Sequence, residues 1–248
     1  MENKTAVITG ASSGIGKAIA KYFLEKGLNL ILNSSTQSKL EAAYDELGSP
    51  FNVHLVPGDI SDKLVGEKLA EYAIRQYGRI DVLVNNAGVF RPKPFLEVTK
   101  SDLDLFLATN LKGTFFTTQA AIRKMVEQAE GGAVINIGTV LVDHAIAGFP
   151  STAPLTSKGA IHALTRQLAA EFGKHNIRIN TIAPGIIRSP LQAKIGVENA
   201  DSLAGLHLLG RIGEPYEVAE AAYYLARSEF VTGETLNVAG GHTVGHAL

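Results

Sequence analysis

The stretch VITGASSGIG, Val7 to Gly16, decides the fold of this 248-residue chain. An apolar run leads into it and a helical pattern follows it, so its three glycines stand in a turn between a strand and a helix. Glycine lets the backbone turn sharply and approach a ligand closely, because no Cβ stands in the way. The first N–H groups of the helix are unpaired and carry a partial positive charge, which suits a diphosphate. The stretch therefore predicts a dinucleotide site at the start of a doubly wound sheet.

Short apolar runs alternate with longer stretches of helical periodicity, and these runs are 5–9, 28–32, 52–56, 81–85, 133–137, 177–182 and 235–238. Strands buried on both faces are apolar throughout, and their alternation with helices is typical of βαβ units. We therefore predict an α/β fold, with residues 1–248 forming a single doubly wound Rossmann-type domain. Its seven-stranded sheet should be mainly parallel, with helices on both faces. Residues 186–213 show weak periodicity, and we expect a loop or short helical lid over the substrate there.

The composition excludes several classes of protein. With 46% hydrophobic and 19% charged residues, the chain fits a well-buried globular protein rather than a disordered one. A formal net charge of -1 without a basic run predicts no nucleic-acid partner, and no apolar run approaches the ~20 residues of a membrane span. The absence of cysteine excludes disulfides, thiolate ligands and a cysteine nucleophile. We expect a cytoplasmic protein that binds no metal.

The pattern Thr9-Gly10-x-x-x-Gly14-Ile15-Gly16 resembles the cofactor turn of the short-chain dehydrogenase/reductase family. Further motifs follow in the order of that family and span almost the whole chain: NNAG (85–88), TNLKG (109–113), AVINIGT (133–139), IAPGII (182–187) and VTGETLNVAGG (231–241). The chain is most similar to the subgroup that includes the 3-oxoacyl carrier-protein reductases. The resemblance implies an NAD(P)-dependent oxidoreductase that acts on a carbonyl or alcohol of a small molecule. It also implies a homo-oligomer, a tetramer or a dimer.

The cofactor residues that the resemblance and the strand ends imply come from turns that follow successive strands, together with one helix. They are Gly10, Ser12, Ser13, Gly14, Ile15, Gly16, Ser34, Ser35, Asp59, Ile60, Asn86, Ala87, Gly88, Lys158, Pro184, Gly185, Ile187 and Ser189. The glycines among them could also serve tight helix–strand packing alone.

The end of the second expected strand bears on the choice of cofactor. An acidic residue there would accept hydrogen bonds from a ribose 2′-hydroxyl and repel a 2′-phosphate. Here Asn33, Ser34 and Ser35 are neutral, and serine hydroxyls can donate to phosphate oxygens. This favours NADP over NAD. Lys17 and Lys39 could add positive charge, although both also fit ordinary surface lysines.

Hydride transfer to a carbonyl leaves charge on oxygen, so the site needs a proton donor and groups that stabilise the oxyanion. In the family a Ser holds the substrate oxygen and a Tyr gives the proton. A Lys four residues later, on the same helix face, lowers the Tyr pKa and binds the ribose, and an Asn anchors water. Asn110 and Lys158 match the Asn and the Lys, and Thr139 stands at the Ser position. The Tyr position holds Pro154.

Proline has no ionisable group, so the general acid of the family is missing from the sequence. Such a loss typically costs on the order of 10²–10⁴ in rate. His144, five residues after Thr139, is the candidate substitute, because an imidazole is a competent proton donor near neutral pH. Three hypotheses stay open. The first is an oxidoreductase in which His144 or water gives the proton, the second a dinucleotide-binding regulatory or structural subunit without turnover, and the third a lyase or isomerase.

Overall fold

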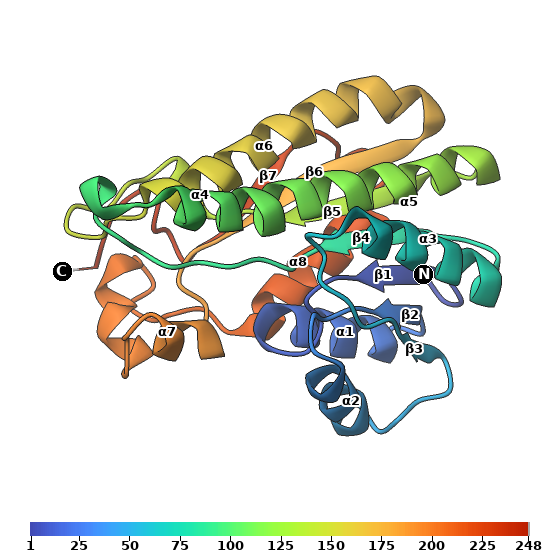
Figure 1. Cartoon of the computed structure of the whole chain (residues 1–248), viewed down its shortest axis with the longest axis horizontal. Helices are drawn as coiled ribbons and strands as arrows, with labels where there is room; N and C mark the ends of the chain where they lie inside the picture. Colours follow the sequence, from blue (N-terminus) through green and yellow to red (C-terminus); the bar gives the residue numbers. More distant parts are fainter. Residues whose placement is uncertain (248) are drawn as a thin grey trace.

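A computed structural model describes residues 1–247, apart from the side chain of Lys194. Its seven strands form one sheet in the order β3-β2-β1-β4-β5-β6-β7, and each neighbouring pair is parallel (Figure 1). The strands are β1 (Thr5–Ile8), β2 (Asn29–Leu32), β3 (Val53–Leu55), β4 (Val82–Asn85), β5 (Gly132–Ile137), β6 (Ile177–Pro184) and β7 (Thr235–Val238). Each lies within or largely overlaps one of the seven apolar runs. The predicted fold class is confirmed, and the sheet is parallel throughout.

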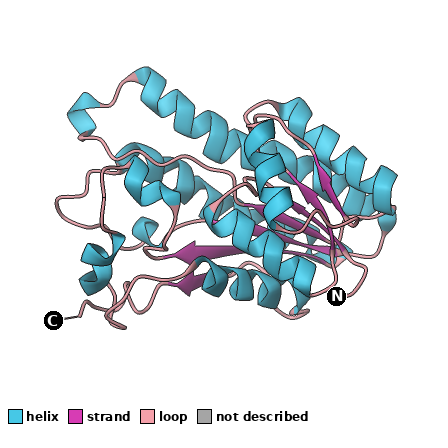
Figure 2. Cartoon of the chain, turned by 90° about the horizontal axis from the view of Figure 1, so that it is seen from below, coloured by secondary structure: helices cyan, strands magenta, loops and turns pink. Residues whose placement is uncertain are grey.

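Helices cover both faces of this sheet (Figure 2). One core joins α1 and α8 to the first face, and a second joins α3, α5 and α6 to the other. The α-helices are α1 (Gly14–Glu25), α2 (Gln37–Glu46), α3 (Lys63–Tyr77), α4 (Lys100–Phe106), α5 (Thr114–Gln128), α6 (Thr152–Phe172), α7 (Pro190–Lys194) and α8 (Pro215–Arg227). The central strands β1 and β4 are buried along their whole length, which explains why they read as continuous apolar runs.

The order of the strands reverses between β1 and β4. The chain moves outward from β1 to β2 and β3, and then returns to add β4 on the opposite side of β1. In open α/β sheets the crevice at such a switch point, beyond the carboxyl ends of the strands, is where ligands bind. The topology therefore predicts a site between the turns that follow β1 and β4.

The segment 186–213, the expected lid, contains two short helices, α7 and the 3-10 helix η5 (Ala200–Leu206). The two ends of this segment lie side by side, because an isolated parallel bridge pairs Ile187 with Gly213. Arg188 adds ion pairs to Asp201 within the segment and to Glu214 just after it. The segment projects beyond the carboxyl end of the sheet, on the side of the molecule where the chain ends (Figure 1).

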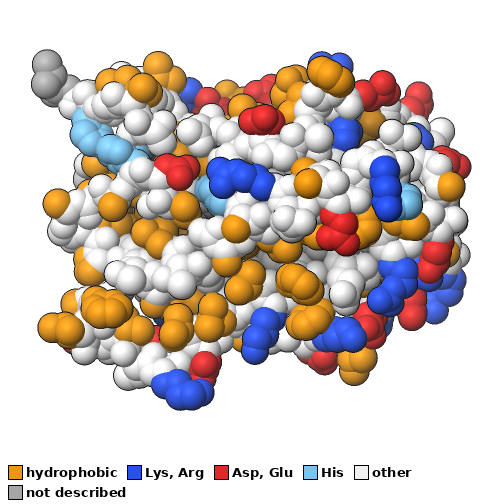
Figure 3. Space-filling view, turned by 90° about the horizontal axis from the view of Figure 1, so that it is seen from above, with side chains coloured by type: hydrophobic (Ala, Val, Ile, Leu, Met, Phe, Trp, Pro, Cys, Tyr) orange, Lys and Arg blue, Asp and Glu red, His pale blue; other side chains and the backbone are white. Residues whose placement is uncertain are grey.

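Basic and acidic side chains are interspersed on the face of the molecule that Figure 3 shows. Neither sign dominates this face, and it carries no continuous basic stripe. This agrees with the formal net charge of -1 for the whole chain. Among the described residues, no helix combines the length and the apolar character needed to cross a membrane.

Candidate active site

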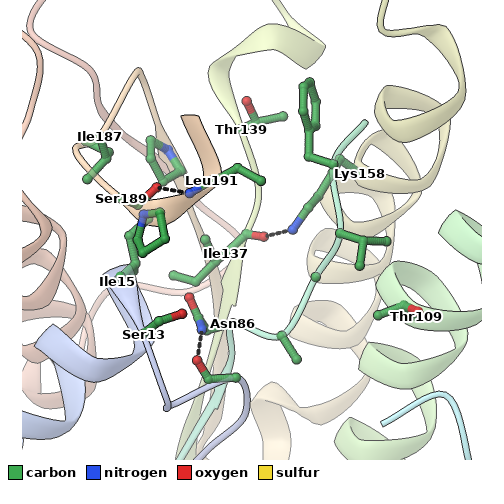
Figure 4. A pocket seen from close by; sticks show the side chains of 18 of the residues that line it. Ser13, Ile15, Asn86, Thr109, Ile137, Thr139, Lys158, Ile187, Ser189 and Leu191 are labelled. Carbon is green, nitrogen blue, oxygen red and sulfur yellow. Dashed lines mark hydrogen bonds between the residues drawn. The ribbon is translucent and has the colours of Figure 1, made fainter. Parts of the chain in front are cut away.

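A cavity of about 600 Å³ opens at the carboxyl ends of the central strands, where the topology predicts a site. Its walls come from the turns after β1 and β4, the ends of β2 and β5, the first turns of α6 and the segment 186–203. Figure 4 shows side chains from these elements pointing toward one space, with Ser13 and Ile15 on one side and Thr139 and Lys158 on the other. Segments far apart in the sequence therefore build a single cleft.

The glycine turn after β1 is shaped by close backbone contacts. Gly10 and Gly14 have φ values of 64° and 52°, in the left-handed region that favours glycine. A Cβ at Gly16 would lie 2.3 Å from the Gly10 carbonyl oxygen and 2.4 Å from Asn86 Nδ2, so Gly16 packs the helix against the turn instead of lining the cavity. Within the described chain, no side chain caps the start of α1, where Ser13 is the N-cap residue. Its first N–H groups are therefore left for an anionic ligand, and the turn fits a dinucleotide diphosphate.

The turn after β4 is tied to the turn after β1 by side-chain hydrogen bonds. Asn86 Nδ2 donates to the carbonyl oxygens of Thr9 and Gly10, at 3.0 Å each. The Thr9 hydroxyl oxygen accepts from the backbone N–H groups of Asn86 and Ala87, also at 3.0 Å. These bonds hold the two turns in one register, so the floor of the cleft beside the glycine turn, its expected cofactor half, is rigid.

Serine hydroxyls line the cavity at the end of β2. Ser34 and Ser35 are among the lining residues, and the Ser34 hydroxyl lies 2.9 Å from that of Ser12. Asn33 also lines the cavity, but its amide donates to the carbonyl oxygens of Val56 and Gly58 and so braces β2 against the chain after β3. Lys17 is paired with Glu46 of α2 and is not one of the lining residues. The positive charge considered from the sequence at Lys17 is therefore already neutralised.

Lys158 projects from α6 into the cavity beside the end of β5 (Figure 4). Its Nζ donates to the Ile137 carbonyl oxygen at 2.6 Å. A Cβ at Gly88 would lie 3.4 Å from this nitrogen, so the glycine after β4 leaves room for the lysine head group. Burial lowers the pKa of Lys158 to about 8, because the charged form loses hydration there.

Asn110 lies behind the cavity wall, in the π-helical segment η2 (Leu107–Gly113). Its side chain is fully buried and accepts from the Val89 N–H at 2.8 Å. Its amide donates to the Val89 carbonyl oxygen and to the Ser157 hydroxyl. The π-helical turn thus places the Asn110 amide where it bonds both to the loop after β4 and to α6. These bonds hold the two walls of the cleft in place.

Pro154 lies in the first turn of α6, where a missing backbone N–H costs little. Its side chain is buried and is not one of the lining residues, while its carbonyl oxygen accepts from the Ser157 hydroxyl at 2.7 Å. Thr139, at the end of β5, does line the cavity. Its hydroxyl oxygen accepts from the Leu141 N–H at 3.3 Å, which leaves the hydroxyl proton free to be donated.

His144 lies in a cluster of four histidines, outside the set of residues that line the cavity. Its ring centroid is 5.3 Å from those of His242 and His246, and His207 is likewise 5.3 Å from His242. His242 is fully buried, and neither of its ring nitrogens has a partner within the described chain. Burial first, and then the neighbouring rings of the cluster, lower its pKa to about 4. Residues 1–247 contain no group of three or more His, Cys, Asp or Glu side chains arranged to hold a metal ion.

The histidine cluster joins the C-terminal segment to the segment 186–213. His207 Nε2 accepts from the Ile186 N–H at 3.1 Å, and Ile186 lines the cavity. The backbone adds two further bonds, one from the Leu209 N–H to the Gly240 carbonyl oxygen and one from the Ala247 N–H to that of Gly205. The chain after β7 therefore supports the wall of the cleft that Thr139, Phe149 and the segment 186–203 form, which is its expected substrate half.

All the expected cofactor residues except Gly16 line the one cavity, together with Thr139 and Lys158. Asn110, Gly16 and His144 lie outside the lining, the first two because they brace it from behind. Sequence reasoning missed most of the apolar wall, which comprises Val89, Phe90, Leu105, Leu141, Phe149, Ile186, Leu191, Ile195, Val197 and Leu203. These residues stand in loops or short helices without a periodic pattern, so only the fold brings them together.

Comparison with known proteins agrees with this architecture. A family model described as Enoyl-(Acyl carrier protein) reductase matches residues 10–243. The 3-oxoacyl-[acyl-carrier-protein] reductase FabG of Thermotoga maritima is 34% identical over 245 residues, covering 97% of this chain and 98% of its own. The D-threitol dehydrogenase of Mycolicibacterium smegmatis is 35% identical, covering 98% and 94%. A crystal structure of a short-chain type dehydrogenase/reductase from Mycobacterium marinum superposes with a TM-score of 0.93 at 30% identity, covering 98% of this chain and 96% of that one.

The fold and these relatives define an oxidoreductase of the Rossmann type. The chain belongs to the short-chain dehydrogenase/reductase family.

Proposed function

We propose that this protein is an NAD(P)-dependent oxidoreductase that interconverts a carbonyl and an alcohol without the tyrosine of its family. The observation that carries the proposal is that Thr139 and Lys158 share one cavity with the glycine turn. A bound nicotinamide dinucleotide would supply or accept the hydride there. Thr139 would donate a hydrogen bond to the substrate oxygen, and the positive charge of Lys158 would stabilise the developing oxyanion. NADP is the preferred cofactor, because Ser34 and Ser35 offer donors and no carboxylate at the end of β2.

The substrate half of the cavity supports a largely apolar substrate. Phe90 and Phe149 stack there with ring centroids 5.9 Å apart, and aliphatic side chains of the segment 186–203 face the same space. Such a wall stabilises hydrocarbon and leaves the hydroxyl groups of a sugar without partners. One relative is named a 3-oxoacyl-[acyl-carrier-protein] reductase and another a D-threitol dehydrogenase. The apolar wall favours a substrate of the first kind for this chain.

A homo-oligomer in the cytoplasm is part of the proposal. Large hydrophobic side chains are exposed on and before α4, on α5, and on and after α8, and they include Phe95, Leu96, Leu103, Phe115, Tyr224 and Phe230. Contacts between copies of the chain would bury them. Sedimentation velocity should then show a dimer or tetramer, and a monomer across the micromolar range would contradict this part.

The proposed activity is tested by binding first and turnover second. Titration with NADPH and NADH, followed by nicotinamide fluorescence, should show tighter binding of NADPH. A screen of 3-oxoacyl thioesters and simple ketones should then show carbonyl-dependent oxidation of NADPH. Tight binding of NADPH without its oxidation by any carbonyl would overturn the oxidoreductase hypothesis. It would leave the hypothesis of a dinucleotide-binding subunit without turnover, which the proline at position 154 suggests. Conversion of substrate with no net change in NADPH would instead indicate a lyase or isomerase.

A further inference from the structure

The cavity holds only two titratable side chains among its described lining residues, Asp59 and Lys158. Asp59 lies after β3, next to Gly58, whose N–H donates to the Ser34 carbonyl oxygen, and its own carboxylate accepts from the Ser61 N–H. It therefore belongs to the end of the cleft at which β2 finishes. Lys158 stands at the other end, with Thr139 and the apolar wall.

We infer that Lys158 Nζ is itself the proton donor for carbonyl reduction in this protein. The inference rests on the proposed function and goes further, because in the family pattern the lysine acts through a tyrosine. His144 packs against His242 and His246 outside the cavity lining, so its ring is not among the groups that face a substrate. Pro154 offers no donor at all. Of the two titratable side chains in the described lining, Lys158 is the one that stands beside Thr139 and the apolar wall.

The surroundings of Lys158 allow it to release a proton. Its Nζ makes a hydrogen bond to the neutral Ile137 carbonyl oxygen, and none of its recorded bonds involves a carboxylate. The groups that face it from β5 and from the loop after β4, Thr139 and Gly88, carry no charge. From η2 comes the neutral amide of Asn110, whose Oδ1 would lie 3.2 Å from a Cβ at Gly88, the same Cβ that would lie 3.4 Å from Lys158 Nζ. An ammonium without a counter-charge in a partly buried site is a stronger acid than one in water.

Three charged or titratable side chains on or before α6, His162, Arg166 and Asp143, belong to the electrostatic surroundings of Lys158. His162 stands one turn after Lys158, and its pKa is lowered by burial in the first place and further by Lys158 and Arg166. Asp143 counteracts this effect by raising the pKa of His162. Burial, the largest of these effects, favours the neutral imidazole, so His162 is not a competing proton donor beside Lys158. Burial lowers the pKa of Lys158 to about 8, which makes its ammonium a stronger acid, and because this value still lies above 7 most of the amine is protonated at neutral pH.

In the proposed reduction, a reduced nicotinamide dinucleotide would be the reductant, and its hydride would form a C–H bond with the carbonyl carbon while the C=O π bond breaks. The π electron pair moves to the oxygen, and an O–H bond forms with a proton from Lys158 Nζ. The carbonyl compound is reduced to an alcohol, the dinucleotide is oxidised, and Lys158 is left as a neutral amine. The amine recovers its proton from water at the open mouth of the cavity.

The test compares the full-length wild-type protein with Lys158→Arg and His144→Ala. Arginine keeps the positive charge and the hydrogen-bond donors but does not release a proton below pH 12. Lys158→Arg should therefore bind NADPH nearly as well as wild type while kcat falls by about 10²–10⁴. In wild type, kcat/KM for reduction should fall about tenfold per pH unit above pH 8, and His144→Ala should keep that alkaline limb.

The outcomes separate this inference from the proposed function. A wild-type protein that binds NADPH and reduces no carbonyl overturns both. Wild-type turnover that survives in Lys158→Arg with the same kcat and the same pH profile overturns the role of Lys158 alone. Loss of the alkaline limb in His144→Ala also overturns it and assigns the proton to His144. Fluorescence titration and circular dichroism on each variant show whether a fall in kcat reflects lost folding or lost cofactor binding.

Discussion

The two halves of the cleft are built by different means. In the cofactor half, the turns after β1 and β4 meet through backbone atoms, through Gly10 and Gly16, and through the bonds of Asn86 and Thr9. In the substrate half, side chains from α6, the loop after β5 and the segment 186–213 form the wall, and the chain after β7 supports it. The first half tolerates almost no change in shape, whereas the second can be altered by single side chains. Substitutions in the two halves should therefore fail in different ways.

The largest effect is expected for Gly16→Ala. The new Cβ would lie 2.3 Å from a backbone oxygen, so α1 must move away from the turn. We expect a loss of about 3 kcal/mol in the free energy of unfolding and about a hundredfold weaker NADPH binding. The matched control is Gly173→Ala, where a Cβ would meet nothing within 4 Å. Urea unfolding and fluorescence titration measure both quantities. An alanine at 16 that behaves like the control would show that the cofactor half is less rigid than described.

Pro154→Tyr should act on turnover and leave the cofactor half unchanged. A tyrosine four residues before Lys158 lies on the same face of α6, so its phenol can reach the lysine and the substrate. We expect kcat to rise by about ten- to a hundredfold, since a positioned general acid contributes on the order of 10²–10⁴. Pro154→Phe supplies the ring without the hydroxyl and should give no gain. Equal rates for the two variants, each with normal cofactor binding, would mean that the missing phenol does not limit the reaction.

His242 should make the support of the substrate half sensitive to pH. Its pKa falls from an ordinary 6.5 to about 4 in the folded chain, so the unfolded chain binds more protons in this range. Stability is therefore full above pH 6.5 and falls as the pH drops toward 4, by on the order of 2–3 kcal/mol at pH 4.5. His242→Phe keeps a ring without a titratable group and should remove that share of the loss. Denaturant unfolding at pH 7.5 and 4.5 tests this, with His175→Phe, outside the cluster, as control. A loss of the same size in His242→Phe as in wild type would contradict the assignment.

The smallest of the expected effects belongs to the choice between cofactors. Ser35→Asp places a carboxylate at the end of β2, where it would repel a 2′-phosphate and accept from a 2′-hydroxyl. The dissociation constant for NADPH should rise about tenfold, which corresponds to about 1.4 kcal/mol, while that for NADH changes little or falls. Ser101→Asp on α4, outside the cavity lining, should affect neither. A variant that loses both cofactors equally would show that Ser35 has a structural role and does not select the cofactor.

The same contrast explains what could be predicted from the sequence. The cofactor half depends on backbone turns, and turns need glycine at particular spacings, so Gly10, Gly14 and the NNAG stretch were visible as patterns. Phe149 and Leu203 belong to segments without periodicity, and only the folded chain brings them to one wall. His144 illustrates the limit most clearly. Because His144 follows Thr139 by only five residues, the sequence suggested a position in the pocket. The rings that it contacts, those of His242 and His246, are about a hundred residues away in the sequence, and no local pattern indicates these contacts.

The bonds between the C-terminal segment and residues 205–209 have a practical consequence. The N-terminus and the described part of the C-terminal segment lie on opposite sides of the molecule, and the N-terminus is far from the substrate half (Figure 1). An affinity tag fused at the C-terminus would disturb the C-terminal segment that carries His242 and His246. A tag fused before Met1 would lie away from the cleft. Preparations of this protein for kinetic work should therefore carry their tag at the N-terminus.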